Sequence, residues 1–288
     1  MSVEKEDLEE IKVNNLYLRV FSSFFLILLI YCLFLNDNFF FPIIIHSLVS
    51  LSIWEFLRLL NYRNSDRISS DKGNFFLSRQ RLNYSDFLVI ILINLFISSM
   101  IFSAFAISFF LVFCLLFIFF FLKFKLSKII GIFYVSSPYC VLILLSRDLN
   151  YQDFLILILF YAVVTDTSSF LVGSFLKGRK IAPKISPGKT ISGSVGGLII
   201  PSLISLLIFI ETYDSVIMIV VTSIIFSIIV QVGDLIESYY KRVCFVKESS
   251  NLIPGHGGVL DRFDGLALLI VFVYILKLLN FKFYFIMY

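Results

Sequence analysis

The sequence predicts an all-α polytopic integral membrane protein with about nine transmembrane helices, a cytosolic N-terminus and polar loops on the cytosolic side. Two observations lead to this fold class. Of the 288 residues, 59% are hydrophobic and only 15% are charged, and the mean hydropathy is +0.96. A soluble domain has about 45–50% apolar and about 25% charged residues, so lipid must be the solvent for most of this chain. The second observation is that Lys and Arg gather at alternate ends of the expected helices.

The expected helices follow from the length that a bilayer requires, about 20 mostly apolar residues. The apolar run from Phe87 to Leu122 is too long for one crossing, so we divide it near Ser103. We predict no cleavable signal peptide, because the N-terminus is acidic and no small-residue cleavage site follows the first apolar run. The expected spans are 16–35, 39–60, 86–102, 104–122, 128–145, 153–174, 191–210, 215–236 and 264–283.

The positions of Lys and Arg test this helix count independently. Of the 24 Lys and Arg residues, only Arg147, Lys277 and Lys282 fall on one side of the membrane, and all the others fall on the opposite side. A wrong number of helices would break the alternation from the error onward. We therefore expect the N-terminus in the cytosol and the C-terminus outside it. The predicted organisation is a single membrane domain over 1–288, with an acidic cytosolic tail over 1–15, N-terminal transmembrane helices over 16–150 and polar helices and loops over 151–288.

Acidic residues lie near the predicted cytosolic ends of the last helices. Asp166 falls in the cytosolic half of the sixth helix, and Asp234 falls near the end of the eighth. Asp261 and Asp264 lie where the ninth begins, although Asp264 alone could equally be a helix cap. Carboxylates at this depth are costly and indicate a function. They bind Mg²⁺, while Lys and Arg neutralise phosphate, so the combination indicates phosphoryl or nucleotidyl transfer.

The first polar loop, over 174–197, contains Gly188-Lys189-Thr190, which invites comparison with a Walker A motif. We reject that motif because Pro183 stands where its first glycine is required, and because no strand is expected before the loop. The Gly, Ser and Lys content still suits a phosphate cradle of backbone N–H groups. An ordinary basic loop that obeys the positive-inside rule explains the segment equally well.

The second polar loop, over 233–265, begins with four polar residues at the spacing of one helical face. A glycine turn from Pro254 to Gly258 follows, which lets backbone approach a ligand closely. Capping explains single residues here but not the whole set. The polar residues of the helical face are Asp234, Glu237, Ser238 and Lys241.

At these residues the sequence resembles the phosphatidate cytidylyltransferases, also called CDP-diacylglycerol synthases. The resemblance is sharp over about 160–265 and only topological before that. The family signature corresponds to Ser238, Lys241-Arg242, Lys247-Glu248, Pro254 to Gly258 and Asp261-Arg262-Phe263-Asp264. Further upstream features are Asp166-Thr167, Ser186-Pro187, Lys189-Thr190, Gly233-Asp234 and Glu237-Ser238.

The chain departs from the family pattern at two places and resembles it at one further place. Glu248 stands where the family usually has Asp, which keeps the charge. Ile191-Ser192 stand where the family usually has Trp-Glu, so a carboxylate is absent from the first loop. Trp54-Glu55 looks like another family trait, but by itself it is equally a pair at the membrane interface.

The resemblance implies an enzyme of phospholipid biosynthesis, which converts CTP and phosphatidate to CDP-diacylglycerol and diphosphate. It implies Mg²⁺ as cofactor, with a second cation, Mg²⁺ or K⁺, as an option, and an active site that faces the cytoplasm from a bacterial inner membrane. The implied partners are CTP, phosphatidate and membrane lipid, with no nucleic acid and with a homodimer left open.

The resemblance also assigns roles to residues of the two polar loops, and His256 is expected to contact the turn or a phosphate rather than act as a base. The implied metal ligands are Asp234 and Asp261, with Asp166 as a further candidate. The implied catalytic residues are these two aspartates with Lys241, Arg242 and Arg262. The implied substrate-binding residues are Ser186, Lys189, Thr190, Ser238, Lys247, His256, Gly257, Gly258 and Asp264.

Two other functions stay open at this point. Another CTP-dependent membrane lipid enzyme, such as a polyprenol kinase or an archaeal-type lipid cytidylyltransferase, would be distinguished by its product, because a kinase releases CDP rather than diphosphate. A transporter also carries acidic residues within its helices. The acids here gather at one face of the membrane rather than along a path through it, which disfavours transport.

Overall fold

The structure, a computed structural model, describes residues 2–36, 38–63, 82–211 and 215–281. It contains two compact units. Unit 1 comprises residues 1–132 and 248–261, and unit 2 comprises residues 133–247 and 262–288. Some of the cations on which the predicted topology depends lie outside the described residues, namely Arg67, Lys72, Arg79, Arg81 and Lys282.

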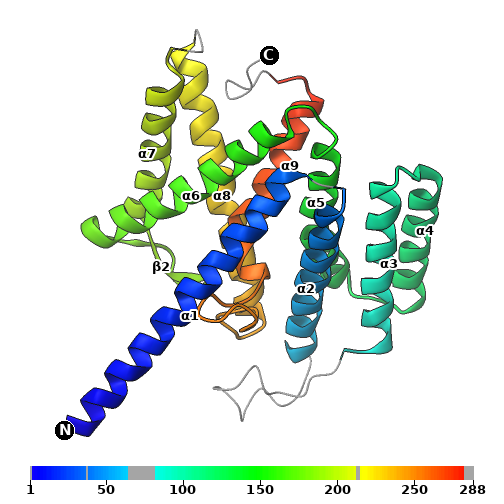
Figure 1. Ribbon diagram of the computed structural model, residues 1–288, viewed down its shortest axis with the longest axis horizontal. Coiled ribbons are helices and arrows are strands. Elements are labelled where there is room, and N and C mark those ends of the chain that lie inside the picture. Colours follow the sequence, from blue (N-terminus) through cyan, green and yellow to red (C-terminus); the bar gives the residue numbers. More distant parts are fainter. Residues whose placement is uncertain (1, 37, 64–81, 212–214, 282–288) are drawn as a thin grey trace. The chain divides into compact units, whose positions relative to one another are not determined.

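Nine α-helices lie within the described residues, where the sequence predicts apolar spans (Figure 1). The predicted division near Ser103 is confirmed, because α3 ends at Ile101, α4 begins at Phe105, and Ser103 between them has a φ of 56°. The helices are α1 (Ser2–Leu35), α2 (Phe40–Arg63), α3 (Tyr84–Ile101), α4 (Phe105–Phe121), α5 (Leu126–Leu145), α6 (Tyr151–Leu176), α7 (Ile191–Phe209), α8 (Val216–Val243) and α9 (Asp264–Leu278).

Helices α1 and α8 extend furthest beyond their expected bounds. Helix α1 begins at Ser2, so it extends through the acidic segment that was expected to be a tail. Helix α8 continues to Val243, beyond the expected end at residue 236. This extension keeps Asp234 and Lys241 on one continuous helix, as their spacing predicts.

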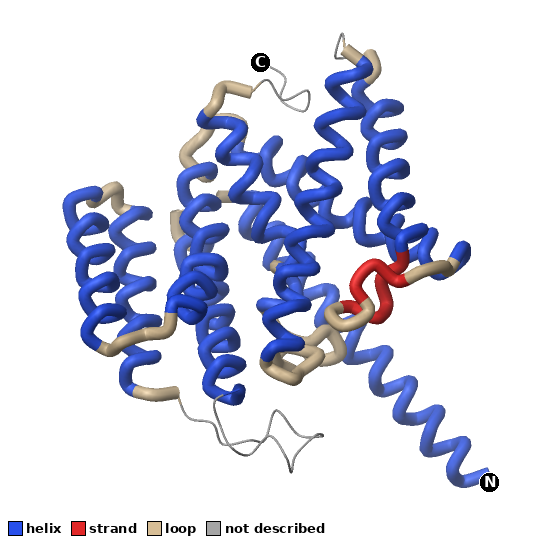
Figure 2. Tube along the Cα trace, turned by 180° about the vertical axis from the view of Figure 1, so that it is seen from behind, coloured by secondary structure: helices blue, strands red, loops and turns tan. Residues whose placement is uncertain are grey.

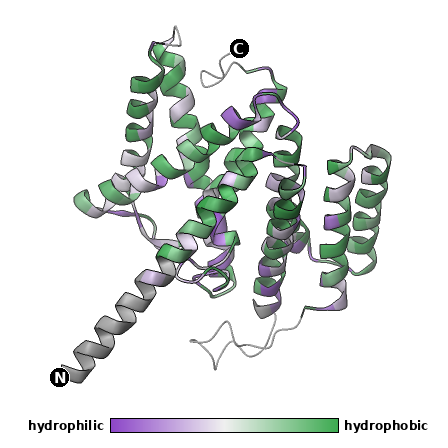
Figure 3. Ribbon diagram, viewed as in Figure 1, coloured by the Kyte–Doolittle hydropathy of each residue, from purple (hydrophilic) through white to green (hydrophobic). Residues whose placement is uncertain are grey.

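Six of the described helices are long and apolar enough to cross a membrane. Helix α3, which is one of the six, and the shorter helix α4 are both covered mostly by hydrophobic residues (Figure 3). Phe109, Phe113 and Phe120 on α4 are exposed, which suits contact with lipid. The helical fold and the presence of helices suited to a membrane are thus confirmed, while the count of nine crossings and their orientation stay predictions. The six helices cover Phe40–Asn61, Tyr84–Ile101, Leu126–Leu145, Tyr151–Leu176, Ile191–Phe209 and Val216–Val243, and two shorter apolar stretches cover Val20–Leu35 and Ala106–Phe121.

The segment between α6 and α7 forms an antiparallel hairpin of β1 (Lys180–Ala182) and β2 (Ser186–Thr190), which is drawn red in Figure 2. Helix α6 leads into the first polar loop, as expected, and β1 lies within the loop, directly before Pro183. The Walker A motif is still excluded, because proline occupies the position of its first glycine. Strands of three and five residues are too short for an alternating pattern to reveal them in the sequence.

Unit 1 is organised around α2, which packs against α1 and α3. Ile45, Val49, Ile53 and Leu57 recur every four residues along α2 and are all fully buried. This spacing places them on one face of the helix, so their burial supplies much of the apolar core of the unit.

A buried ion pair adds a polar tie to unit 1. The Asp86 carboxylate, at the start of α3, accepts a hydrogen bond from Lys128 Nζ of α5 at 2.6 Å and from Asn61 Nδ2 of α2 at 2.7 Å. Asp86 is fully buried, and both of its oxygens have partners. The pair therefore holds the ends of three helices together without leaving a buried charge unmatched.

In unit 2, glycines allow α6 and α7 to approach closely. A Cβ atom added to Gly193 would lie 2.6 Å from the Ser169 carbonyl oxygen and 3.1 Å from the Cα of Gly173. A Cβ atom added to Gly196 would lie 2.5 Å from Val172. Small residues at such contacts let helix backbones approach in membranes, where no hydrophobic force drives helices together.

Helices α8 and α9 make a similar close contact, and this contact positions the polar residues beside it. A Cβ atom added to Gly233 would lie 2.8 Å from the carbonyl oxygen of Asp264. Glycine at this position therefore allows α9 to begin next to α8, with Asp234 directly after the contact point.

Candidate functional site

Both units contain residues that the sequence analysis selected. Unit 1 holds the glycine turn and one aspartate, and unit 2 holds the remaining residues. The selected residues in unit 1 are His256, Gly257, Gly258 and Asp261. Those in unit 2 are Asp166, Ser186, Lys189, Thr190, Asp234, Ser238, Lys241, Arg242, Lys247, Arg262 and Asp264.

Strand β2 leads directly into α7 and carries three of these residues. Ser186 begins the strand, and Thr190 ends it as the N-cap of α7, with Oγ1 accepting a hydrogen bond from Gly193 N at 3.1 Å. Thr190 is buried, so its observed role is to satisfy an N–H group of the first helical turn. Lys189, one residue earlier, places its Nζ 2.5 Å from Oδ2 of Asp234 on α8. The hairpin thus brings the first polar loop to the polar face of α8.

The polar face of α8 has the arrangement that its spacing predicts. Ser238 Oγ donates to Asp234 Oδ1 at 3.3 Å, and Lys241 Nζ lies 3.2 Å from Glu237 Oε1. Lys241 and Glu237 are both buried, whereas the Asp234 side chain is 22% exposed. Asp234 is therefore the carboxylate on this face that both carries a positive partner and remains open to a ligand.

Arg242 has a structural partner that the sequence did not indicate. Its Nε donates to the carbonyl oxygen of Ile185, in the turn of the hairpin, at 2.9 Å. A second guanidinium nitrogen donates to the carbonyl oxygen of Val246 at 2.9 Å. The side chain thereby ties the hairpin to the end of α8, in addition to any contact with phosphate.

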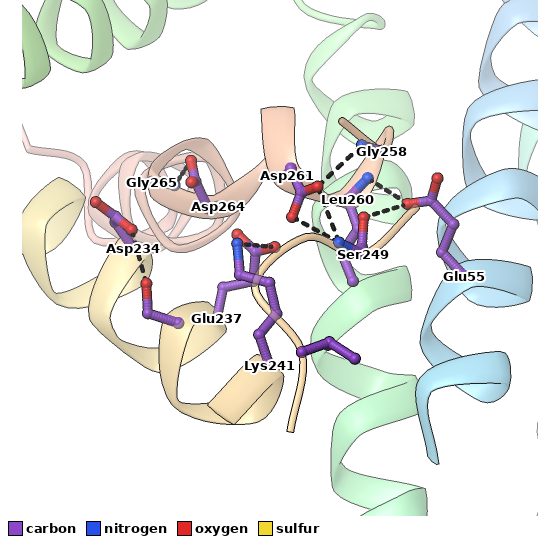
Figure 4. Close-up of polar contacts among 12 residues, drawn as sticks. Glu55, Asp234, Glu237, Lys241, Ser249, Gly258, Leu260, Asp261, Asp264 and Gly265 are labelled. Atoms are coloured by element: carbon purple, nitrogen blue, oxygen red, sulfur yellow. Dashed lines mark hydrogen bonds and ion pairs between the residues drawn. The ribbon is translucent and has the colours of Figure 1, made fainter. Parts of the chain in front are cut away.

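Three aspartates of unit 2 influence one another electrostatically. Asp166 of α6 interacts with Asp234 of α8 and with Asp264 of α9, although the three are far apart in the sequence. Lys189 and Arg262 also act on Asp166. Figure 4 shows Asp234 on α8 and Asp264 at the start of α9. Unit 2 thus gathers carboxylates and cations in one region, as the sequence analysis proposed for a site that handles phosphate and a hard cation.

The start of α9 differs in detail from a simple capping arrangement. Phe263 occupies the N-cap position and makes no side-chain capping bond, while Asp264 is the first residue of the helix. Asp264 Oδ1 accepts a hydrogen bond from Gly265 N at 2.7 Å. The helix dipole favours a negative charge in this first turn, whereas burial and the neighbouring Asp234 act against it.

The glycine turn of unit 1 surrounds the Asp261 carboxylate. Ser249 N donates to both of its oxygens at 3.0 and 3.2 Å, and Gly258 N donates to Oδ2 at 2.9 Å. Gly257 has a φ of +85°, a conformation that side chains other than glycine rarely adopt. His256 Nδ1 lies 2.7 Å from Ser22 Oγ, which also donates to the carbonyl oxygen of Pro254. His256 therefore contacts α1 through its ring and helps to fix the turn.

The sequence analysis left Glu55 of α2 out of the predicted site, although its side chain organises this turn. The carboxylate accepts hydrogen bonds from two hydroxyl groups and two backbone N–H groups of unit 1, some of which Figure 4 draws. An acidic residue in an apolar helix, next to Trp54, was the one available signal. The donors are Ser249 Oγ at 2.9 Å, Ser250 Oγ at 2.5 Å, Val259 N at 3.0 Å and Leu260 N at 2.8 Å.

Within the described residues, no group of three His, Cys, Asp or Glu side chains is placed to hold a metal ion by itself. Mg²⁺ commonly binds proteins through one or two carboxylates and completes its coordination with water and substrate phosphates. The donor chemistry of Asp234, with Asp166 and Asp264 in its electrostatic neighbourhood, fits such a cation.

Apolar helices suited to a membrane, together with carboxylates and cations suited to a nucleotide's phosphates, are the combination expected of a membrane nucleotidyltransferase. The sequence model of the cytidylyltransferase family matches residues 17–279, and the chain belongs to that family.

Several curated proteins named phosphatidate cytidylyltransferase are similar to it. The protein of Rickettsia conorii is 37% identical over 159 residues, which are 52% of this chain and 69% of that protein. The proteins of Staphylococcus saprophyticus and Staphylococcus aureus are 39% and 40% identical over 137 and 139 residues, in each case 47% of this chain and 49% of the relative. The alignments thus span from about half to just over two thirds of these relatives.

Proposed function

We propose that this protein transfers the cytidylyl group of CTP to phosphatidate, forming CDP-diacylglycerol and diphosphate. The observation that carries the proposal is the region of unit 2 where Asp166, Asp234 and Asp264 interact with one another and with Lys189 and Arg262. Carboxylates that suit a hard cation, beside cations that suit a triphosphate, match the needs of nucleotidyl transfer. The names of the relatives support the choice of phosphatidate as acceptor.

The proposed reaction needs charge neutralisation more than a strong base. An oxygen of the phosphatidate phosphate attacks the α-phosphorus of CTP, a new P–O bond forms, and the bond from the α-phosphorus to the bridging oxygen breaks. The electron pair of that bond leaves with diphosphate. The attacking oxygen is already anionic, so no side chain has to remove a proton from it. Lys189, Lys241 and Arg262 neutralise the phosphates, and His256 acts as a turn contact.

Lys189 has a specific part in this proposal. Its ion pair with Asp234 is 2.5 Å long, and both side chains are partly exposed. An incoming triphosphate offers Lys189 a second anionic partner and so leaves Asp234 able to bind a cation. The pair therefore keeps the charges of the site balanced before the nucleotide arrives.

Asp234 would hold Mg²⁺, and Asp261 and Asp166 stay the further predicted ligands. A bound Mg²⁺ supplies positive charge at the phosphate oxygens. The Asp261 carboxylate already accepts backbone N–H groups of Ser249 and Gly258. Since a carboxylate has about four acceptor positions, these bonds are compatible with a metal ligand. A second cation, Mg²⁺ or K⁺, and a homodimer both stay predictions.

We further propose nine crossings of a bacterial inner membrane, with the N-terminus and the active site on the cytoplasmic side. The alternation of Lys and Arg supports this orientation. The six long apolar helices support a location in a membrane. The bacterial relatives support the choice of a bacterial membrane.

The test is a product assay with purified protein in detergent, phosphatidate and Mg²⁺. Parallel reactions contain CTP labelled on the α-phosphate or on the γ-phosphate. Cytidylyl transfer puts only the α-label into the lipid and releases the γ-label as diphosphate. Transfer of the γ-label into the lipid, with CDP in the water phase, would identify a kinase and contradict the proposal.

A further inference from the structure

Glu55 is an unusual residue for the interior of an apolar helix. It lies on α2, its side chain is fully buried, and α2 is one of the six helices suited to a membrane. A buried carboxylate is strongly destabilising unless its oxygens accept enough hydrogen bonds. Glu55 therefore needs hydrogen-bond donors at this position, and the location of these donors shows which part of the chain the side chain holds.

Those partners all come from one segment, residues 249–260, and from both of its ends. Oε2 accepts from Ser249 Oγ and Leu260 N, and Oε1 accepts from Ser250 Oγ and Val259 N. Each oxygen thus joins the start of the segment to its end. The carboxylate closes the segment into a loop at the place where Asp261 follows.

The glycine turn is shaped around the same carboxylate. A Cβ atom added to Gly258 would lie 2.6 and 2.7 Å from the two oxygens of Glu55, and 1.9 Å from Ser249 Oγ. Glycine at residue 258 is therefore needed because the glutamate occupies the adjacent space. Arg58, three residues further along α2, also interacts electrostatically with Glu55.

We infer that Glu55 is a positioning residue, whose carboxylate closes the segment 249–260 and thereby fixes the backbone N–H groups that hold Asp261. The link is direct, because Ser249 and Gly258, which donate to Asp261, also border Glu55. Glu55 itself touches no reacting group. The effect on turnover rests on the proposed function, whereas the effect on the loop does not.

Glu55→Gln tests the closure with little change in side-chain volume. Each glutamate oxygen accepts one backbone N–H group, so either orientation of the glutamine amide opposes an NH₂ group to Val259 N or Leu260 N. A backbone donor, unlike a hydroxyl group, cannot rotate away or reverse its role. One of these two amides must therefore lose its acceptor.

The first measurement is amide hydrogen exchange over residues 249–261 in the full-length protein in detergent. Glu55→Gln should accelerate exchange in this segment by at least about tenfold, since a buried N–H group loses its acceptor. The matched control is Asp86→Asn, which changes another fully buried carboxylate of unit 1. Its partners Lys128, Asn61 and Asn83 all lie outside the segment. Exchange that is the same in Glu55→Gln as in the wild type would overturn the inference. If Glu55→Gln does not fold, Ser250→Ala removes one donor to the carboxylate and should produce the same local change in smaller measure.

The second measurement separates a positioning role from a purely structural one. Glu55→Gln should lower kcat by at least about tenfold while the KM for CTP changes by less than about threefold. The Lys and Arg side chains of unit 2 that are proposed to bind the nucleotide are unchanged in this variant. Asp86→Asn should not produce this split. Faster exchange in the segment, with no cytidylyl transfer by the wild type, would refute the proposed function and retain the positioning role. A wild-type enzyme that transfers the cytidylyl group, with unchanged exchange and kcat in Glu55→Gln, would refute the positioning role alone.

Discussion

Gly258→Ala is the substitution whose effect follows most directly from the geometry of the glycine turn. The added Cβ would lie 1.9 Å from Ser249 Oγ and 2.6 and 2.7 Å from the Glu55 oxygens, distances that real Cβ atoms essentially never show. The backbone of residue 258 is not in the left-handed region, so the effect arises from space alone. The Glu55 carboxylate has to withdraw, and the N–H groups of Val259 and Leu260 then lose their acceptor.

The expected magnitude is about 2–6 kcal/mol, because two buried N–H groups are left without an acceptor at about 1–3 kcal/mol each. Thermal unfolding in detergent should show a melting temperature lower by at least about 5 °C. Gly188→Ala is the control for the added methyl group, because nothing lies within 4 Å of a Cβ atom at that position. Equal melting temperatures for the two variants would refute the close approach of Glu55 to the turn.

Three further predictions concern the chemistry. Asp234→Asn and Asp261→Asn should each abolish turnover while the protein still inserts and folds, and normal activity in either variant would remove that residue from the metal site. His256→Ala should be less severe than either, because its ring contacts Ser22 and no base is required; complete loss of turnover with a folded protein would instead indicate a general base. Removal of divalent cations with a chelator should stop label transfer and added Mg²⁺ should restore it, so turnover that persists after chelation would contradict a metal-dependent reaction.

The helices were predictable from the sequence because lipid imposes a simple requirement on each of them. About 20 apolar residues in a row are needed for a crossing, and such runs are visible without knowledge of the fold. The division near Ser103 and the polar face from Asp234 to Lys241 were predicted for equally local reasons, namely helix length and helical spacing.

The features that the sequence did not reveal depend on contacts between distant residues. The partners of Glu55 lie some two hundred positions later in the chain, with separations of 194 to 205 residues. The bond from Arg242 to Ile185 likewise depends on where the hairpin lies, and the hairpin strands are too short to produce a pattern. Glycines 257 and 258 were recognised as a turn, but the reason for the second glycine is a carboxylate from another helix.

The central claim is that the carboxylates and cations of unit 2 transfer a cytidylyl group to a lipid phosphate. The most direct measurement compares the wild type with Asp234→Asn, each purified in detergent with phosphatidate, Mg²⁺ and CTP labelled on the α-phosphate. We predict label in the lipid and an equal amount of diphosphate from the wild type, and neither product from a folded Asp234→Asn protein. CDP in the water phase without lipid label, or equal label transfer by both proteins, would contradict the account.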